Sequence, residues 1–397
     1  MGMRVLELIY GFQLGGRGGG IARFGIELSR ALYQRGFDVH LCGLFDTGTS
    51  VEREWLARLN GEGINPFCAS KWDKDHPYLS FWKAVQTLWH WQSQHNAKVI
   101  HSHSEFSDVA AIILKFHPTR PTVIRTVHYG FRHEWRKRPW RRWILTNFLY
   151  PLLFDLEIGV SQTITTTLNT RPLARILKKR ALCIYNAIDL ARFQGVEVDR
   201  ATKRRDFNIP DDVPLIGTVG RLTEQKGHSF LLAAVPLVLN EIPQAHFLII
   251  GDGELSDNLR YQTQTLGITH RVTFAGSRSD IEEILACLDL FVSSSLWEGL
   301  PTAILESMAA GVPVVATDIP GTRELVKNRY SGWLVPPGDS VALAKAILEA
   351  LENPHLRIEF AYRAQQIARS FSIGSIADEY EKILLSLERV PSRDRLF

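Results

Sequence analysis

Short runs of β-branched and aliphatic residues alternate with segments of helical periodicity along the chain, and this alternation constrains the fold more than any other feature. It is typical of parallel sheets built from βαβ units. A first series of expected strands covers residues 4–9, 37–44, 97–100, 122–127 and 156–160. A second series covers residues 215–219, 246–250, 272–274, 288–293 and 313–316. We therefore predict the α/β class, with two doubly wound, Rossmann-like domains.

The two series of strands imply a division of the chain. At roughly 100–200 residues per domain, 397 residues favour two or three domains. We expect an N-terminal domain over residues 1–190 and a C-terminal domain over residues 191–375. Ligands of open α/β sheets bind beyond the carboxyl ends of the strands. Two such domains facing each other would place those loops on either side of one cleft.

Composition and charge exclude several classes of protein. Hydrophobic residues make up 45% of the chain, which argues against a disordered protein. The four cysteines lie far apart and form no C-x-x-C pair, so we expect neither a disulfide scaffold nor a zinc ribbon, and a cytoplasmic location. The N-terminal apolar stretch contains charges, and no uncharged apolar run reaches 18 residues, which predicts no signal peptide and no membrane span. The net charge of +4 argues against a nucleic-acid partner.

A helix is predicted over residues 301–310, because proline and glycine stand at its two ends. The backbone N–H groups of Thr302 and Ala303 would point out of its N-terminus, where an anion can bind. Glu298 precedes this site, and Glu306 lies about two turns into the helix. The amides suit a diphosphate, and the carboxylates suit sugar and ribose hydroxyls. The alternative is a helix whose glutamates are only solvated.

Arg221 and Lys226 stand on the loop that follows the expected strand 215–219, where each could pair with phosphate oxygens. The loop is not a P-loop, because G-x-x-x-x-G-K-[ST] is absent. Alone, such residues are usually solvated surface. A shared site with the Glu298 segment favours the phosphate-binding role.

Glycines and histidines at other strand ends add weaker signals. The glycines within residues 15–20 do not fit G-x-G-x-x-G, which disfavours a nicotinamide dehydrogenase. They would let backbone amides approach an anion, although a flexible turn explains them equally well. His128 closes the strand 122–127 and could donate to a sugar hydroxyl or a phosphate. His101 and His103 are weaker candidates, and we expect at least one of them in the core.

With these residues the chain resembles the glycosyltransferases of family 4, which are retaining, use a nucleotide sugar and have the GT-B fold. The resemblance covers essentially the whole chain. It is carried most specifically by three blocks together, residues 250–254, 298–306 and 332–339. The family also implies that a C-terminal helix, within residues 376–397, crosses back onto the first domain.

The resemblance implies roles for the acidic and basic candidates. Arg221 and Lys226 would hold the donor diphosphate, and Glu306 would bind the ribose hydroxyls. Glu298 would bind the donor sugar. His128, Arg221, Lys226 and Glu298 are then the expected catalytic residues.

The remaining donor contacts are expected from backbone. The amides of Gly299 and Leu300 would bind the donor sugar, while Gly18 and Gly19 would lie near the diphosphate and the acceptor. Pro301 departs from the glycine that many relatives carry, so one amide donor is lost there.

The family reaction retains the anomeric configuration through same-face attack, with the leaving phosphate helping to deprotonate the acceptor. No Asp-x-Asp motif is present, so we expect no metal and no cofactor. The sequence does not identify the donor, and we favour a UDP-sugar over a GDP-sugar. The expected acceptor is a glycan or a polyprenyl-diphosphate-linked sugar in the synthesis of a cell-surface polysaccharide.

A basic, tryptophan-rich stretch predicts contact with an anionic membrane. Residues 132–143 hold six Lys/Arg and one Glu, and without them the chain has 40 basic against 41 acidic residues. Tryptophan prefers the bilayer interface, and Lys/Arg attract anionic headgroups. We expect peripheral binding to the inner face of the membrane, although the tryptophans could instead pack inward. The residues of this patch are Arg132, Trp135, Arg136, Lys137, Arg138, Trp140, Arg141, Arg142 and Trp143.

Two other functions fit the same sequence. A soluble glycosyltransferase acting on a small metabolite would leave the basic patch without a role. A sugar-nucleotide sensor without catalytic activity would not need the full set of Arg221, Lys226, Glu298 and Glu306. Nucleotide release from candidate donors separates an enzyme from a sensor.

Overall fold

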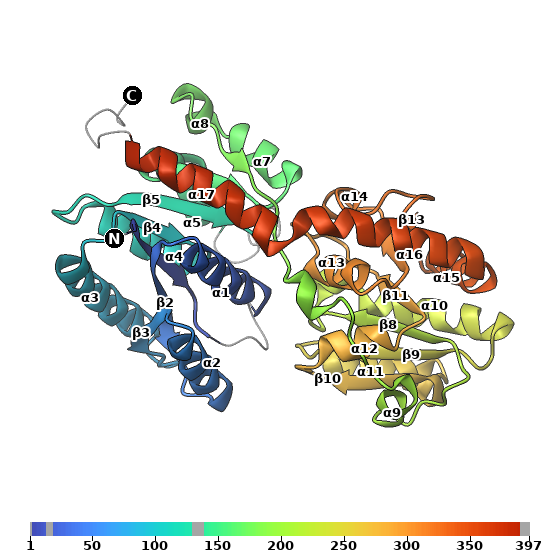
Figure 1. Cartoon of the computed structure of the whole chain (residues 1–397). Helices are drawn as coiled ribbons and strands as arrows, with labels where there is room; N and C mark the ends of the chain where they lie inside the picture. The colour runs from blue at the N-terminus through green and yellow to red at the C-terminus, as the bar shows by residue number, and fades with distance from the viewer. Residues whose placement is uncertain (1, 13–18, 129–138, 390–397) are drawn as a thin grey trace. The chain divides into compact units, whose positions relative to one another are not determined.

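The chain forms two compact units in the computed structural model, which describes residues 2–12, 19–128 and 139–389. Met1–Ala187 with Ile373–Phe397 makes the first unit, and Ile188–Ser372 makes the second. Each unit contains one sheet of parallel strands with helices packed on it (Figure 1). The predicted α/β class with two doubly wound sheets is confirmed. The chain passes between units after residues 187 and 372, whereas the sequence pattern predicted 190 and 375.

The first sheet has seven strands in the order β3-β2-β1-β4-β5-β6-β7. Its strands are β1 (Arg4–Ile9), β2 (Asp38–Asp46), β3 (Asn65–Lys71), β4 (Val99–Ser102), β5 (Thr122–Val127), β6 (Leu156–Gly159) and β7 (Leu182–Cys183). Its helices are α1 (Gly19–Gln34), α2 (Ser50–Gly61), α3 (Pro77–His95), α4 (Glu105–Lys115), α5 (Pro139–Ile144), α6 (Tyr150–Leu153), α7 (Gln162–Asn169), α8 (Pro172–Ile176) and α17 (Ile373–Arg389). A π-helical turn, η2 (Leu145–Leu149), joins α5 to α6.

The central strands β1, β4 and β5 of the first sheet are buried on both faces, as their apolar runs predict. Alternate residues of β1 belong to different core clusters: Val5 packs with α1 and α17, whereas Leu6 and Leu8 pack with α3, α4 and α6. The C-terminal helix α17 joins the core of this unit through Ile376, Ala377, Tyr380 and Leu384.

The second sheet has six strands in the order β10-β9-β8-β11-β12-β13. They are β8 (Leu215–Val219), β9 (His246–Ile250), β10 (Val272–Gly276), β11 (Leu290–Ser293), β12 (Val314–Thr317) and β13 (Trp333–Val335). The helices are α9 (Arg200–Arg205), α10 (His228–Glu241), α11 (Ser256–Thr265), α12 (Ile281–Ala286), α13 (Thr302–Ala309), α14 (Pro320–Arg323), α15 (Ser340–Glu352) and α16 (Pro354–Ala368). Short 3-10 turns are η3 (Leu190–Arg192), η4 (Glu224–Lys226), η5 (Thr269–Arg271) and η6 (Arg369–Phe371).

Several observed elements differ from the predicted ones, and three examples follow. The edge strand β3 was not predicted, since Pro66 and polar residues mask its pattern. Pro301 is the N-cap of α13 with φ −75° and ψ 100°, so the helix begins at Thr302 instead of at the proline. Strand β4 begins two residues later than predicted. Among the described residues, no helix is long and apolar enough to cross a membrane.

Candidate active site

Two loops of the second unit leave the sheet at the point where its strand order reverses. Strands β8 and β11 are parallel neighbours there, with Leu290 opposite Ile216 and Phe291 opposite Gly217. Residues 220–227 follow β8, and residues 294–301 follow β11. Ligands of doubly wound sheets bind outside the carboxyl ends of the strands at such a reversal. The topology therefore brings the Arg221–Lys226 loop beside the Glu298 loop.

The carboxylate of Glu298 is the centre of the contacts between these loops. Lys226 Nζ lies 2.6 Å from its Oε1, and Ser295 Oγ donates to the same oxygen at 2.8 Å. Gln225 Nε2 donates to Oε2 at 3.1 Å. The Glu298 side chain is only 8% exposed, so its charge depends on these partners. Lys226, predicted as a phosphate ligand, and Glu298, predicted as a sugar ligand, are thus already in contact.

Backbone contacts hold the two loops together. The amide of Leu296 donates to the carbonyl of Gln225 at 2.8 Å, and Ser294 Oγ donates to the carbonyl of Lys226 at 3.0 Å. Gly227 has φ +60°, and a Cβ there would overlap the carbonyl oxygen of Ser294. Only glycine allows this approach in this backbone conformation without displacement.

Helix α13 points its N-terminus into the same region. It follows β11 by one loop, and no side chain caps its first turn. The N–H groups of the first turn of a helix have no intrahelical acceptor, and they carry the positive end of the helix dipole. The first-turn amides therefore place partial positive charge at the end of the loop that carries Glu298.

Glu306 lies farther along α13, and its environment differs from that of Glu298. Burial raises the pKa of Glu306 to about 7, although nearby Arg192 and Lys226 act in the opposite direction. Arg192 itself pairs with Glu282 at 2.6 Å. Near neutral pH this carboxyl group is therefore partly protonated, and a ligand that donates hydrogen bonds would favour its ionised form.

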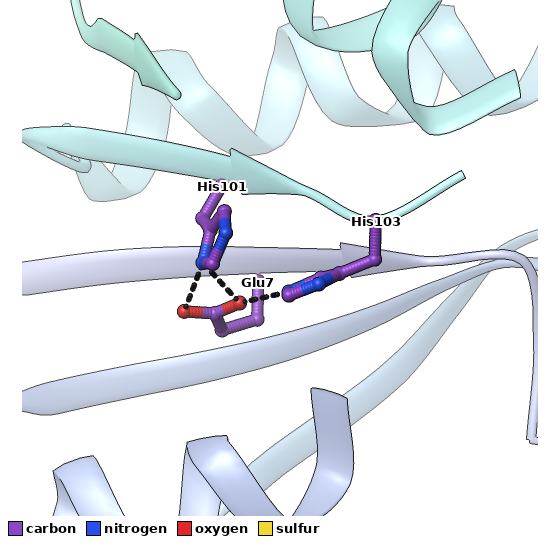
Figure 2. A group of neighbouring side chains, drawn as sticks. All are labelled: Glu7, His101 and His103. Atoms are coloured by element: carbon purple, nitrogen blue, oxygen red, sulfur yellow. Dashed lines mark hydrogen bonds and ion pairs between the residues drawn. The ribbon is translucent and has the colours of Figure 1, made fainter. Parts of the chain in front are cut away.

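A separate polar cluster lies within the first unit, at the strand reversal between β1 and β4. Glu7 accepts from His101 Nδ1 at 3.0–3.1 Å and from His103 Nε2 at 2.8 Å, and all three side chains are buried (Figure 2). Their ligand atoms lie within 4.8 Å of one another, close enough to hold a metal ion on distance alone. His128 lies beside them, with Nε2 3.3 Å from His103 Nδ1 and Nδ1 3.0 Å from Asn186 Oδ1.

Two family models match the chain along most of its length. Residues 18–192 match the one described as Glycosyltransferase Family 4, and residues 199–367 match Glycosyl transferases group 1. The chain belongs to the family 4 glycosyltransferases. The resemblance inferred from the motifs is therefore confirmed.

The relatives of this glycosyltransferase include proteins named for a lipid-linked acceptor and for lipopolysaccharide core synthesis. An Escherichia coli protein, UDP-Gal:alpha-D-GlcNAc-diphosphoundecaprenol alpha-1,3-galactosyltransferase, is 27% identical over 77% of this chain and 79% of its own length. The Rhizobium meliloti lipopolysaccharide core biosynthesis glycosyltransferase LpsE is 35% identical over 50% of this chain and 57% of its own length. The crystal structure of Anabaena HepE in complex with UDP-glucose matches with a TM-score of 0.79 at 23% identity, covering 97% of this chain and all of that one. That likeness establishes the GT-B fold.

The structure does not describe every residue predicted for the site of this glycosyltransferase. Gly18 and the patch residues Arg132, Trp135, Arg136, Lys137 and Arg138 lie outside the described residues, as do the side chains of Arg141 and Arg142. Gly19 is buried at the start of α1. Glu7 was missed as a polar-cluster residue; the only signal for it was a charged residue within an apolar strand.

Proposed function

We propose that the chain transfers a sugar, with retention of configuration, from a UDP-sugar to a lipid-linked or glycan acceptor in cell-surface polysaccharide synthesis. The contact between the Lys226 loop and Glu298 at the uncapped start of α13 carries the proposal. It combines cations and amides for a diphosphate with a held carboxylate for sugar hydroxyls. UDP is favoured because the named relatives include a UDP-galactose enzyme and a UDP-glucose complex.

The proposed donor contacts follow from the chemistry of each group. Arg221 and Lys226 bind the diphosphate, together with the amides of Thr302 and Ala303. Glu306 accepts from the ribose hydroxyls. Glu298 and the amides of Gly299 and Leu300 bind the donor sugar, and His128 is assigned to the same sugar on the family resemblance.

The proposed reaction needs no separate general base. The acceptor oxygen forms a bond to the anomeric carbon on the face from which UDP departs, while the bond from that carbon to the β-phosphate oxygen breaks. The acceptor proton passes to the departing phosphate oxygen. Arg221, Lys226 and the dipole of α13 stabilise the charge that develops on the diphosphate, so we propose that no metal takes part.

Nucleotide binding and release test this function. The chain should gain thermal stability from UDP and UDP-sugars, more than from GDP-sugars, and should release UDP when an acceptor is present. Arg221→Ala should weaken UDP binding about tenfold to a hundredfold, since a charge-assisted hydrogen bond contributes about 1.5–3 kcal/mol. Lys345→Ala, on the exposed face of α15, is the control. Equal UDP affinity of Arg221→Ala and wild type would refute the phosphate assignment.

The affinity for UDP-glucose should fall as pH decreases through the pKa of Glu306. Without ligand, the Glu306 carboxyl group has a pKa of about 7. Ribose hydroxyls that donate to this group bind its ionised form, so binding requires that the protonated group lose its proton. Between pH 8 and pH 6 we expect a decrease in affinity of about tenfold. Isothermal titration with UDP-glucose measures it without the titrating terminal phosphate of UDP. Glu306→Gln should bind UDP-glucose weakly, with an affinity that does not depend on pH. If the affinity of the wild type does not change between pH 6 and pH 8, the proposed contact of Glu306 with the ribose is wrong.

The described part of the tryptophan-rich patch supports a membrane role. Helix α5 begins at Pro139. The residues that follow it contact the rest of the first unit: the Arg125 guanidinium lies over the ring of Tyr150 at 4.1 Å, and Arg171 Nη1 donates to the carbonyl of Thr146 at 3.0 Å. Four large side chains remain 39–65% exposed: Trp140, Trp143, Ile144 and Phe148. We propose that they enter the interface of the inner membrane leaflet and bring a lipid-linked acceptor to a cytoplasmic enzyme.

Co-sedimentation with liposomes tests the membrane proposal. Wild type should bind vesicles rich in anionic lipid, and high salt should release it, because each Lys/Arg contributes about 1 kcal/mol near the surface. Replacing Arg136, Lys137, Arg138, Arg141 and Arg142 with glutamine should abolish binding. A control variant loses five basic residues elsewhere: Arg53, Arg205, Arg260, Lys345 and Lys382. The membrane role is wrong if both variants sediment alike.

A further inference from the structure

Strand register places three polar residues on one face of the first sheet. Glu7 of β1 pairs in register with His101 of β4, and His101 pairs with Ile124 of β5, two residues before Thr126. Val5, Val99 and Ile124 lie two residues before Glu7, His101 and Thr126 on their strands, so their side chains are on the same face of the sheet. They pack against α1 and α17. Glu7, His101 and Thr126 therefore stand between the sheet and these helices, in an otherwise apolar layer.

The polar side chains in this layer form one continuous hydrogen-bonded chain. Tyr380 Oη of α17 lies 2.8 Å from Thr126 Oγ1, which lies 2.8 Å from His101 Nε2. His101 and His103 meet on the carboxylate of Glu7, as Figure 2 shows, and His103 leads on to His128. A buried carboxylate that no hydrogen bond satisfied would be very costly, so these contacts are required by the fold.

The distances in the cluster match hydrogen bonds better than metal ligation. The nitrogen–oxygen contacts of Glu7 are 2.8–3.1 Å long. Two ligands of one tetrahedral zinc ion, each about 2.0–2.1 Å from the metal, stand roughly 3.3 Å apart. Both histidine nitrogens that face Glu7 are thus placed as N–H donors.

We infer that Glu7 is a positioning residue that fixes the tautomer of His128 through His103, so that His128 presents a bare Nδ1. An ionised carboxylate only accepts, so His103 Nε2 must carry a hydrogen, and Nδ1 of the neutral ring accepts. His128 Nε2 then donates to His103 Nδ1. The remaining nitrogen of His128 is an acceptor, suited to a hydroxyl group that donates to it.

The electrostatics of the cluster agree with this assignment. Burial opposes ionisation of Glu7, but the two histidines outweigh it and hold its pKa at about 2. Burial lowers the pKa of His103 to about 4 and that of His128 well below its ordinary value. Near neutral pH the cluster therefore has an ionised Glu7 beside neutral His103 and His128.

Asn186 completes the chain at the far side of His128. Its carboxamide oxygen faces Nδ1 at 3.0 Å, and a half-turn of the carboxamide presents the N–H2 end to a bare Nδ1. Asn186 is thus the internal partner that a ligand hydroxyl would replace. The assignment of this hydroxyl to the donor sugar rests on the proposed function. The tautomer of His128 does not depend on the proposed function.

Nitrogen-15 NMR of the histidine side chains tests the inference directly. In wild-type protein, His128, assigned by its loss in His128→Gln, should show a protonated Nε2 and a bare Nδ1. Glu7→Gln should convert this single tautomer into a mixture or its reverse. Tyr380→Phe is the matched control, because it removes a hydroxyl from the other end of the chain and leaves Glu7 and His103 intact. The wild-type spectrum is decisive even if Glu7→Gln fails to fold.

Kinetics add a readout that a purely structural role would not change. Glu7→Gln should lower kcat about tenfold or more at unchanged UDP affinity, as expected for a group that orients a ligand-binding histidine. Tyr380→Phe should keep kcat near wild type. A protonated Nδ1 in wild-type His128, an unchanged tautomer in Glu7→Gln, or an altered tautomer with unchanged kcat each overturns the inference. Failure of UDP binding in the wild type would instead reject the proposed function.

Discussion

Replacing Glu298 with glutamine should lower kcat about a hundredfold while the affinity for UDP stays the same or rises slightly. Lys226 at 2.6 Å and Ser295 at 2.8 Å hold the carboxylate in place, as the proposed role of a fixed acceptor for the donor sugar requires. Glutamine keeps the shape but loses the charge, and loss of one preorganised polar group from a reacting centre costs roughly 10²–10³ in rate. UDP carries no donor sugar, so its binding does not depend on the Glu298 carboxylate. In the variant, Lys226 is no longer paired with a carboxylate, which favours its interaction with the diphosphate.

The sign of the UDP effect distinguishes Glu298 from Glu306. Glu306→Gln should weaken binding of UDP itself, because the ribose is present in the bare nucleotide. Glu352→Gln, at the exposed end of α15, controls for loss of one carboxylate. Fluorescence or calorimetric titration gives the affinities, and UDP release under saturating donor gives kcat. Weaker UDP binding in Glu298→Gln with unchanged kcat would reverse the two assignments.

The central strands were predictable because burial on both faces leaves a short apolar run with clear ends. Strands β1, β5, β8 and β9 begin and end at the predicted residues. The helices and edge strand between residues 46 and 97 were not predicted. Strand β3 is mostly half-buried, is exposed at both ends and contains Pro66, so its pattern differs from that of a central parallel strand.

The candidate residues were recognisable singly, but their partners were not. Lys226 and Glu298 are 72 residues apart and meet only because β8 and β11 are neighbours in the sheet. The sequence motifs assigned one to phosphate and the other to sugar, with no sign that they pair. Glu7 reads in sequence as an interruption of an apolar strand, since its partner His101 lies 94 residues away.

Gly227→Ala should disrupt the contact between the loops of residues 220–227 and 294–301 far more than the same substitution at Gly267. The two glycines share a left-handed conformation, with φ +60° and +69°, so both substitutions carry a backbone cost of about 1 kcal/mol. At Gly267 a Cβ meets nothing within 4 Å, whereas at Gly227 it overlaps the carbonyl oxygen of Ser294. Relieving that overlap should cost a further 1–3 kcal/mol, by the typical penalty for overpacking.

Relief of the overlap must move one loop away from the other, because the Ser294 carbonyl oxygen is backbone and the alanine Cβ is bonded directly to the Cα of residue 227. The displacement acts on Lys226, the residue before Gly227, and on its contact with Glu298 at 2.6 Å. We therefore expect Gly227→Ala to lose UDP affinity at least tenfold, whereas Gly267→Ala should bind like wild type after losing about 1 kcal/mol of stability. Urea denaturation measures the stabilities, and calorimetric titration measures the affinities. Equal losses in the two variants would mean that the close approach of the loops at Gly227 does not position the donor site.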